Sequence, residues 1–91
     1  MNLRFLETFV CAARLKSFSL AAEKLNTSQA AVSSRIATLE TDLGVKLFER
    51  DIRGVRLTAV GHSALAKAED LVRRAADFRQ SLADPEAVRG A

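Results

Sequence analysis

The sequence predicts a mainly α-helical fold, with three helices, a short β-hairpin and a long helix at the C-terminal end. Three patterns support this expectation. Two amphipathic helical segments are separated by a very short turn. A stretch in which apolar and polar residues alternate follows them, and a heptad pattern then extends almost to the end of the chain. The chain has 91 residues, which is enough for one domain at most.

The composition fits a helical domain that has an anionic partner. All five aromatic residues are phenylalanine, so the core must consist mainly of Leu, Val, Ile and Ala. Lysine and arginine number 14 against 11 aspartate and glutamate residues, a formal net charge of +3. This excess is weak evidence by itself, but it makes nucleic acid the first candidate partner.

Cysteine use and hydropathy bear on the cellular location. The single cysteine, Cys11, excludes an intrachain disulfide and fits a cytosolic protein. No apolar run approaches the ~20 residues that a membrane-spanning helix needs. Residues Met1 to Arg4 lack the layout of a signal peptide. We therefore expect a cytoplasmic protein that contacts no membrane.

The first two helices are expected over Leu3 to Ala13 and Leu20 to Leu25. In the first segment apolar residues recur at spacings of three and four, which is the period of an amphipathic helix. Residues 16–18 interrupt this pattern. Ser19 is the expected N-cap of the second helix, because its hydroxyl can accept a hydrogen bond from a free backbone N–H.

The third helix is expected from Gln29 to Leu43, directly after a tight turn at Asn26 and Thr27. Asparagine tolerates the left-handed conformation that ends a helix. Ser28 can cap the third helix, and Gly44 is placed to end it. Two helices joined by so short a turn indicate a helix-turn-helix. The stripe expected to face the core consists of Val32, Ile36, Leu39 and Leu43.

A β-hairpin is expected next, because the helical period disappears between Val45 and Leu57. Val55 and Leu57 alternate with Arg56 as in a short strand, and Gly54 suits the tip of a hairpin. A hairpin in this position is called a wing. Residues 1–57 are therefore predicted to form a winged helix-turn-helix domain.

A long helix is expected from its N-cap Thr58 to about Asp84, where Pro85 would stop it. At 1.5 Å per residue it would be ~40 Å long. A body this small cannot cover so long an apolar stripe, so we expect residues 58–84 to be a linker helix through which two chains form a homodimer. Residues 85–91 are expected to form a flexible tail. The expected dimer interface is a heptad seam that consists of Ala64, Leu65, Ala68, Leu71, Val72, Ala75, Phe78 and Leu82.

The outward face of the third helix has the composition of a surface that approaches DNA. Between Lys24 and Leu39 there is no acidic residue, and small or hydrogen-bonding side chains replace the charged pairs of an ordinary solvated face. Glutamine and serine can both hydrogen-bond to base edges. Small residues also suit contact with another protein, so the helix alone does not decide between DNA binding and protein binding. The outward residues are Ala30, Ser34, Ala37, Thr38 and Thr41, with Ser33 and Arg35 on the flanks.

Basic residues around the expected wing favour DNA. Arg53 and Gly54 at its tip could place a guanidinium in a minor groove, where narrow A·T tracts concentrate negative potential. The alternative is a set of solvated basic residues that two neighbouring acids partly offset. The basic residues are Lys46, Arg50, Arg53 and Arg56.

The sequence has no pattern typical of a catalytic or metal site. His62 is the only histidine, and with a single cysteine elsewhere it belongs to no metal-ligand set. No Ser-His-Asp arrangement or Gly-rich phosphate loop is present, and Glu69 and Asp70 suit a solvated helix face. We therefore expect no enzyme, no metal and no cofactor.

Spaced motifs over nearly the whole chain carry a family resemblance. They are Phe18 to Asn26, Ser28 to Ser33, Ile36, Leu39 with Glu40, Leu43 to Val45, Leu47 to Arg50, and Gly54 to Thr58 with Gly61. Together they resemble the LysR-type transcriptional regulators, specifically their N-terminal winged helix-turn-helix and linker helix. Such regulators are bacterial, usually dimerise through the linker helix, often form tetramers at full length, and bind interrupted inverted repeats in double-stranded DNA.

The resemblance also implies roles for individual residues. The recognition helix would lie in the major groove and the wing in the minor groove. The base-reading positions would be Gln29, Ala30, Ser33 and Ser34, the minor-groove positions Arg53 and Gly54, and the phosphate-binding positions Ser19, Thr27, Ser28, Thr38 and Arg50.

The recognition helix departs from the family pattern at three positions. The family often has proline where Ala30 stands, arginine where Ser34 stands and glutamine where Arg35 stands. The basic residue is thereby displaced by one position, about 100° around the helix. Arg35 is therefore a further base-reading candidate, with phosphate binding as its alternative role.

The family also has a large C-terminal effector-binding domain, which these 91 residues do not include. We therefore expect an excised DNA-binding part, with a naturally short regulator as the alternative. The other function to weigh is a dimeric protein-interaction module without DNA readout. RNA binding ranks third, because the chain lacks an aromatic stacking platform.

Overall fold

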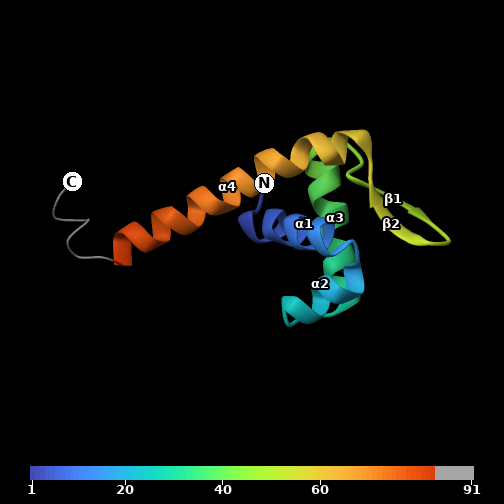
Figure 1. Ribbon diagram of the computed structural model, residues 1–91, viewed down its shortest axis with the longest axis horizontal. Coiled ribbons are helices and arrows are strands. Elements are labelled where there is room, and N and C mark those ends of the chain that lie inside the picture. Colours follow the sequence, from blue (N-terminus) through green and yellow to red (C-terminus); the bar gives the residue numbers. More distant parts are fainter. Residues whose placement is uncertain (84–91) are drawn as a thin grey trace.

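Four helices and one hairpin make up the computed structural model, which describes residues 1–83. Figure 1 shows the first three helices gathered together, the hairpin projecting at one end and the last helix extending away on the opposite side. The mainly α-helical, winged helix-turn-helix fold is confirmed. The elements are α1 (Leu3–Leu15), α2 (Phe18–Lys24), α3 (Gln29–Leu43), β1 (Phe48–Asp51), β2 (Gly54–Leu57) and α4 (Ala59–Ala83).

The core lies where the three short helices meet the start of the hairpin. Phe9 and Leu39 are fully buried there, and so is Leu47 just before β1. The Phe48 ring packs edge-on against the rings of Phe9 and Phe18, with centroids 5.7 Å and 5.2 Å apart. Edge-to-face packing of this kind adds to the apolar area that the rings remove from water. The first residue of the wing is therefore anchored to both α1 and α2.

The second helix begins earlier than predicted. Ser17, not Ser19, is its N-cap, and the Ser17 Oγ accepts a hydrogen bond from the Leu20 backbone N–H at 3.0 Å. The cap at Ser17 makes Phe18 the first residue of the helix and buries its ring. The gain from burying a phenylalanine decides between two serines that are equally good caps.

The turn and the third helix follow the prediction closely. Asn26 has a left-handed backbone with φ 55°, the Ser28 Oγ accepts from the Ala31 backbone N–H at 3.0 Å, and Gly44 ends the helix with φ 71°. The predicted buried stripe is correct for all but its last member. Leu43 is 42% exposed, because the buried face of α3 ends one turn earlier, at Leu39.

The two strands pair in antiparallel fashion, from Phe48 opposite Leu57 to Asp51 opposite Gly54. The turn residues are therefore 52 and 53, and Gly54, expected at the tip, is the first residue of β2, with φ 125°. The Arg53 backbone N–H donates to Asp51 Oδ1 at 2.8 Å and stabilises the turn.

A carboxylate of α3 holds the hairpin in place. Glu40 Oε2 accepts hydrogen bonds from the backbone N–H groups of Leu47, at 2.7 Å, and Phe48, at 3.3 Å. Charge-assisted bonds of this kind are stronger than those between neutral groups. The recognition helix and the wing are therefore connected directly as well as through the core.

The last helix packs on α1 with its N-terminal half. Thr58 Oγ1 accepts from the Gly61 backbone N–H at 2.9 Å, which agrees with the expected cap. Arg14 pairs with Glu69, and Arg79 lies 3.9 Å from Glu7. Between these two pairs along α4, hydrogen bonds from the guanidinium groups of Arg73 and Arg74 hold the pKa of Asp70 below its ordinary value.

The predicted dimer seam is thus divided along the helix. Ala68 is 3% exposed inside this chain, and Ala64, Leu65 and Val72 are partly buried against the same core. These four residues contact the core of their own chain, and a part for them in a dimer interface stays a prediction. The remaining large apolar residues are open to solvent, with exposed fractions of 47% for Leu71, 64% for Phe78 and 59% for Leu82.

Two predictions at the C-terminal end, the helix stop near Asp84 and the flexible tail at 85–91, lie outside the described residues. Within residues 1–83 no helix has the length and apolar character needed to cross a membrane.

Candidate nucleic-acid interface

The outward face of α3 is open. Gln29 at its start is exposed, and so are all the small or hydroxyl-bearing residues that the helical period placed outward. Ser33 is half-buried on the side that faces the hairpin, and Ser34 points to solvent. The absence of acidic residues from Lys24 to Leu39 leaves this face without a carboxylate that would repel a phosphate backbone. The exposed outward residues are Ala30, Ser34, Ala37, Thr38 and Thr41.

A groove joins this face to the wing. The starts of α2 and α3 form one wall and the hairpin forms the other. The groove brings together residues that are up to 39 positions apart in the chain, since Lys16 and Val55 both line it. Five of the predicted site residues meet here, namely Ser19, Gln29, Arg50, Arg53 and Gly54.

Arg50 connects the wing to both helices of the helix-turn-helix. Its Nη2 donates to Ser33 Oγ at 2.7 Å, and its Cζ lies 5.0 Å from the centroid of the Phe18 ring. A guanidinium over an aromatic face is attracted by the negative potential of the ring. These two contacts direct the Arg50 side chain toward α2 and α3 at the edge of the groove.

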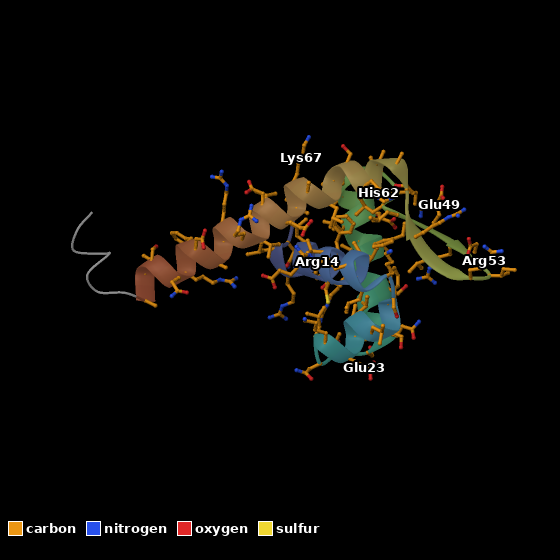
Figure 2. The ribbon with its side chains drawn as sticks, viewed as in Figure 1. Arg14, Glu23, Glu49, Arg53, His62 and Lys67 are labelled. Atoms are coloured by element: carbon orange, nitrogen blue, oxygen red, sulfur yellow. The ribbon has the colours of Figure 1, made fainter. Side chains whose placement is uncertain are left out.

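The hairpin carries three arginines, Arg50, Arg53 and Arg56, which differ in their partners. Arg56 lies 3.8 Å from Glu49 and 3.8 Å from Asp51, so its charge is largely offset. No acidic side chain among residues 1–83 forms an ion pair with Arg53. Figure 2 shows Arg53 at the far tip of the hairpin, well away from the helical body. Arg53 thus differs from Arg56, which lies beside two acids, and from Arg50, which contacts Ser33 and Phe18.

Ser34 and Arg35 lie on different sides of α3. Arg35 is half-buried and lines a hollow with Arg4 of α1 and with Asn26 and Thr27 of the turn. Ser34 belongs to the outward face. The one-residue shift of the basic position therefore moves the guanidinium from the front of the helix to the flank beside the turn.

Two hydroxyls of the predicted phosphate sites are in different states. The Ser28 Oγ is engaged as the cap of α3, where it accepts from the Ala31 N–H. Ser19 is exposed on the first turn of α2 because Ser17 carries out the capping.

Sequence reasoning missed three residues at this surface. Lys16 and Ser17 line the groove, and Phe18 supports Arg50. A basic residue directly before a serine that can cap a helix is a local signal that would have indicated Lys16 and Ser17 as surface residues of the site. No local signal indicates the third, since Phe18 and Arg50 are 32 positions apart. Away from this surface, His62 is exposed on α4, and residues 1–83 contain no cluster of three or more side chains suited to a metal ion.

Comparison with known proteins supports this interpretation of the surface. A family model described as bacterial regulatory helix-turn-helix protein, lysR family, matches residues 3–62. The chain is similar to the transcriptional regulator TfdT of Cupriavidus pinatubonensis, with 41% identity over 90 residues that cover 99% of this chain and 39% of that protein. It is also similar to the regulator ShiR of Corynebacterium glutamicum, with 42% identity over 90% of this chain and 28% of that one.

Solved structures with bound DNA have the same fold. The structure of a BenM_DBD/catB site 1 DNA complex matches with a TM-score of 0.83 and 36% identity, over 88% of this chain and 90% of that one. A CbnR_DBD–DNA complex matches with a TM-score of 0.78 and 37% identity, over 92% of this chain and 100% of that one. The chain spans 39% or less of the length of the two curated relatives named here.

Proposed function

The chain belongs to the lysR family of bacterial regulatory helix-turn-helix proteins, and from this premise we propose that it binds an interrupted inverted repeat in double-stranded DNA as a homodimer. As in the family, it is a DNA-binding domain of a transcriptional regulator. The alternative of a protein-interaction module without DNA readout is not favoured, because neighbours of the same fold are complexes with DNA. In this proposal α3 occupies the major groove and the wing reaches the adjacent minor groove.

The observation that carries the proposal is a surface that runs from the face of α3, which has no acidic residue from Gln29 to Leu39, to the tip of the wing, where Arg53 forms no ion pair within residues 1–83. Along it, Gln29, Ser33 and Ser34 offer hydrogen bonds to base edges, and Ala30 offers contact with a thymine methyl group. Arg53 and Gly54 form the minor-groove contact at the far end. This order of groups matches one helix in a major groove with a hairpin beside it.

Phosphate contacts are proposed on both sides of α3. Arg35 shares a hollow with Thr27, so we assign it to a phosphate beside the turn and leave Ser34 on the base-reading face. Arginine forms bidentate bonds with phosphate oxygens, which suits this flank position. The other proposed phosphate contacts are Ser19, Thr27, Ser28, Thr38 and Arg50.

The exposed half of the α4 seam is the proposed dimer contact. Three large apolar side chains, Leu71, Phe78 and Leu82, are exposed at heptad spacing on one face of α4. A contiguous exposed apolar patch of this kind is typical of an interaction site. With half-buried Ala75 between them, they form a stripe that a second copy of α4 can cover. Tetramer formation in a full-length regulator stays a prediction from the family.

Binding to DNA is expected to depend steeply on salt. Because lysine and arginine side chains displace counterions from phosphates, the logarithm of the affinity should fall by about 0.9 per contacted phosphate for each unit of log salt. Fluorescence anisotropy with labelled duplexes selected from a random pool, measured at several salt concentrations, tests this. An affinity that does not change with salt would contradict the proposed function.

Arg53→Ala is expected to weaken binding most at A·T-rich flanks. Arginine in a narrow minor groove benefits from the enhanced negative potential there, so we expect a loss of roughly ten-fold on A·T flanks and a smaller loss on matched G·C flanks. Arg56→Ala is the matched control, because Arg56 is already paired with Glu49 and Asp51. Equal losses for the two variants would remove Arg53 from the site.

A further inference from the structure

We propose that Arg50 sets the hydrogen-bonding polarity of Ser33, so that the recognition helix reads a hydrogen-bond acceptor on a base edge at that position. Arg50 is on this view a positioning residue for base readout and not only a charge for the phosphate backbone. The inference rests on the proposed placement of α3 in the major groove.

The Arg50 guanidinium is fixed before any DNA arrives. Phe18 lies beneath it at 5.0 Å, and Phe18 is itself 6% exposed and packed against Phe48. The Nη2–Oγ distance to Ser33 is 2.7 Å, a short charge-assisted hydrogen bond. The contact thus joins β1, α2 and α3, and a long flexible side chain has little freedom to leave it.

The bond to Arg50 determines what the Ser33 hydroxyl can still do. A guanidinium has only donors, so the Ser33 oxygen accepts in this bond and keeps its own hydrogen. In helices such a hydrogen commonly goes to the carbonyl four residues earlier. Thr41 bonds in this way to the Ala37 carbonyl at 3.0 Å, and Thr8 to the Arg4 carbonyl at 2.9 Å. Among the described residues, no such bond engages the hydroxyl hydrogen of Ser33.

A polarised donor distinguishes the bases in a predictable order. The positive charge draws electron density from the Ser33 oxygen, which strengthens its O–H as a donor and weakens the oxygen as an acceptor. In the major groove, guanine presents N7 and O6 as acceptors, thymine presents O4, and adenine presents N7 beside its N6 donor, while cytosine presents only the N4 donor. Ser33 should therefore accept guanine, thymine or adenine and disfavour cytosine at the base that it contacts.

The experiment compares base preferences of variants of the 91-residue chain. Sites are selected from a random duplex pool with the unaltered chain, and affinities are then measured on all single-base changes in one half-site. Ser33→Ala should flatten the preference at one position, from about 3–10-fold against cytosine, the value of one hydrogen bond, to under two-fold. Arg50→Lys keeps the positive charge but loses the planar fork, and it should flatten the same position and no other.

The control variant is Arg56→Lys, an equal change on the same hairpin at a residue that pairs with Glu49 and Asp51 instead. It should leave the preference unchanged. The double variant of Ser33→Ala with Arg50→Lys should show no flattening beyond that of either single change. Circular dichroism checks that each variant is folded.

Three outcomes would overturn the inference. A loss on Arg50→Lys that is equal for all four bases would leave Arg50 as a phosphate contact alone. A preference for cytosine at the position that depends on Ser33 would reverse the assigned polarity, and a Ser33→Ala profile equal to that of the unaltered chain would remove the base contact. In each case salt-dependent duplex binding would persist and the proposed function would stand, whereas absence of any duplex binding would remove both.

Discussion

Gly61→Ala is expected to lower the free energy of unfolding by about 3 kcal/mol, the upper range for an overpacked site. A Cβ at this position would lie 2.2 Å from the Leu47 carbonyl oxygen and 2.9 Å from Leu57 Cδ2. The Leu47 carbonyl also accepts from the Thr58 backbone N–H at 3.0 Å. Because Leu47 is fully buried, the clash can be relieved only by moving backbone at the base of the wing.

Thermal unfolding followed by circular dichroism measures this effect, and a fall in Tm of roughly 15 °C is expected for a domain of this size. Gly44→Ala is the matched control, since its added methyl group meets no atom within 4 Å and only the φ of +71° is unfavourable. That strain costs about 1 kcal/mol. Equal Tm values for the two variants would show that the close approach of α4 to Leu47 does not limit stability.

Phe78→Asp is expected to convert the proposed dimer to monomers and to reduce affinity for an inverted repeat by 100-fold or more, an order of magnitude set by the loss of bivalent binding. A carboxylate in the middle of the exposed seam would face its copy across the dimer axis without a partner. Sedimentation equilibrium measures the association, and anisotropy on one-half-site and two-half-site duplexes measures the affinity. Phe78→Asp should lower the affinity for the two-half-site duplex and leave the affinity for the one-half-site duplex unchanged.

Gln80→Asp is the control for this prediction, because it adds the same charge to an exposed position on the opposite side of α4. It should leave the dimer intact. Leu71→Asp should resemble Phe78→Asp. A dimer that survives both seam variants would mean that a surface other than α4 joins the protomers.

Local signals predicted the third helix better than the second. Ser28 and Gly44 each stand alone as a cap, so α3 has the predicted bounds. At the start of α2 two serines are available, and the choice of Ser17 depends on the burial of Phe18 in a core that sequence periodicity does not describe.

Tertiary contacts account for the features that the sequence did not predict. A heptad pattern is the same whether an apolar residue meets its own chain or a second one, so spacing does not show that Leu71 is exposed while its neighbour Val72 packs against the core. The bond from Arg50 to Ser33 spans 17 positions, and the bonds from Glu40 to the wing span seven and eight. Such pairs depend on how the hairpin folds back onto α3.

The docking of α4 on α1 has a consequence for the architecture of the operator. The first half of α4 packs on the core of its own chain. In the proposed dimer, the point where two such helices cross would therefore determine how far apart the two copies of α3 stand. Each residue added between Val72 and the crossing point would advance that point by 1.5 Å and rotate it by about 100°. In the proposed dimer, the number of base pairs between half-sites, and their phase around the duplex, would therefore depend on the length of one helix to which no base contact is assigned.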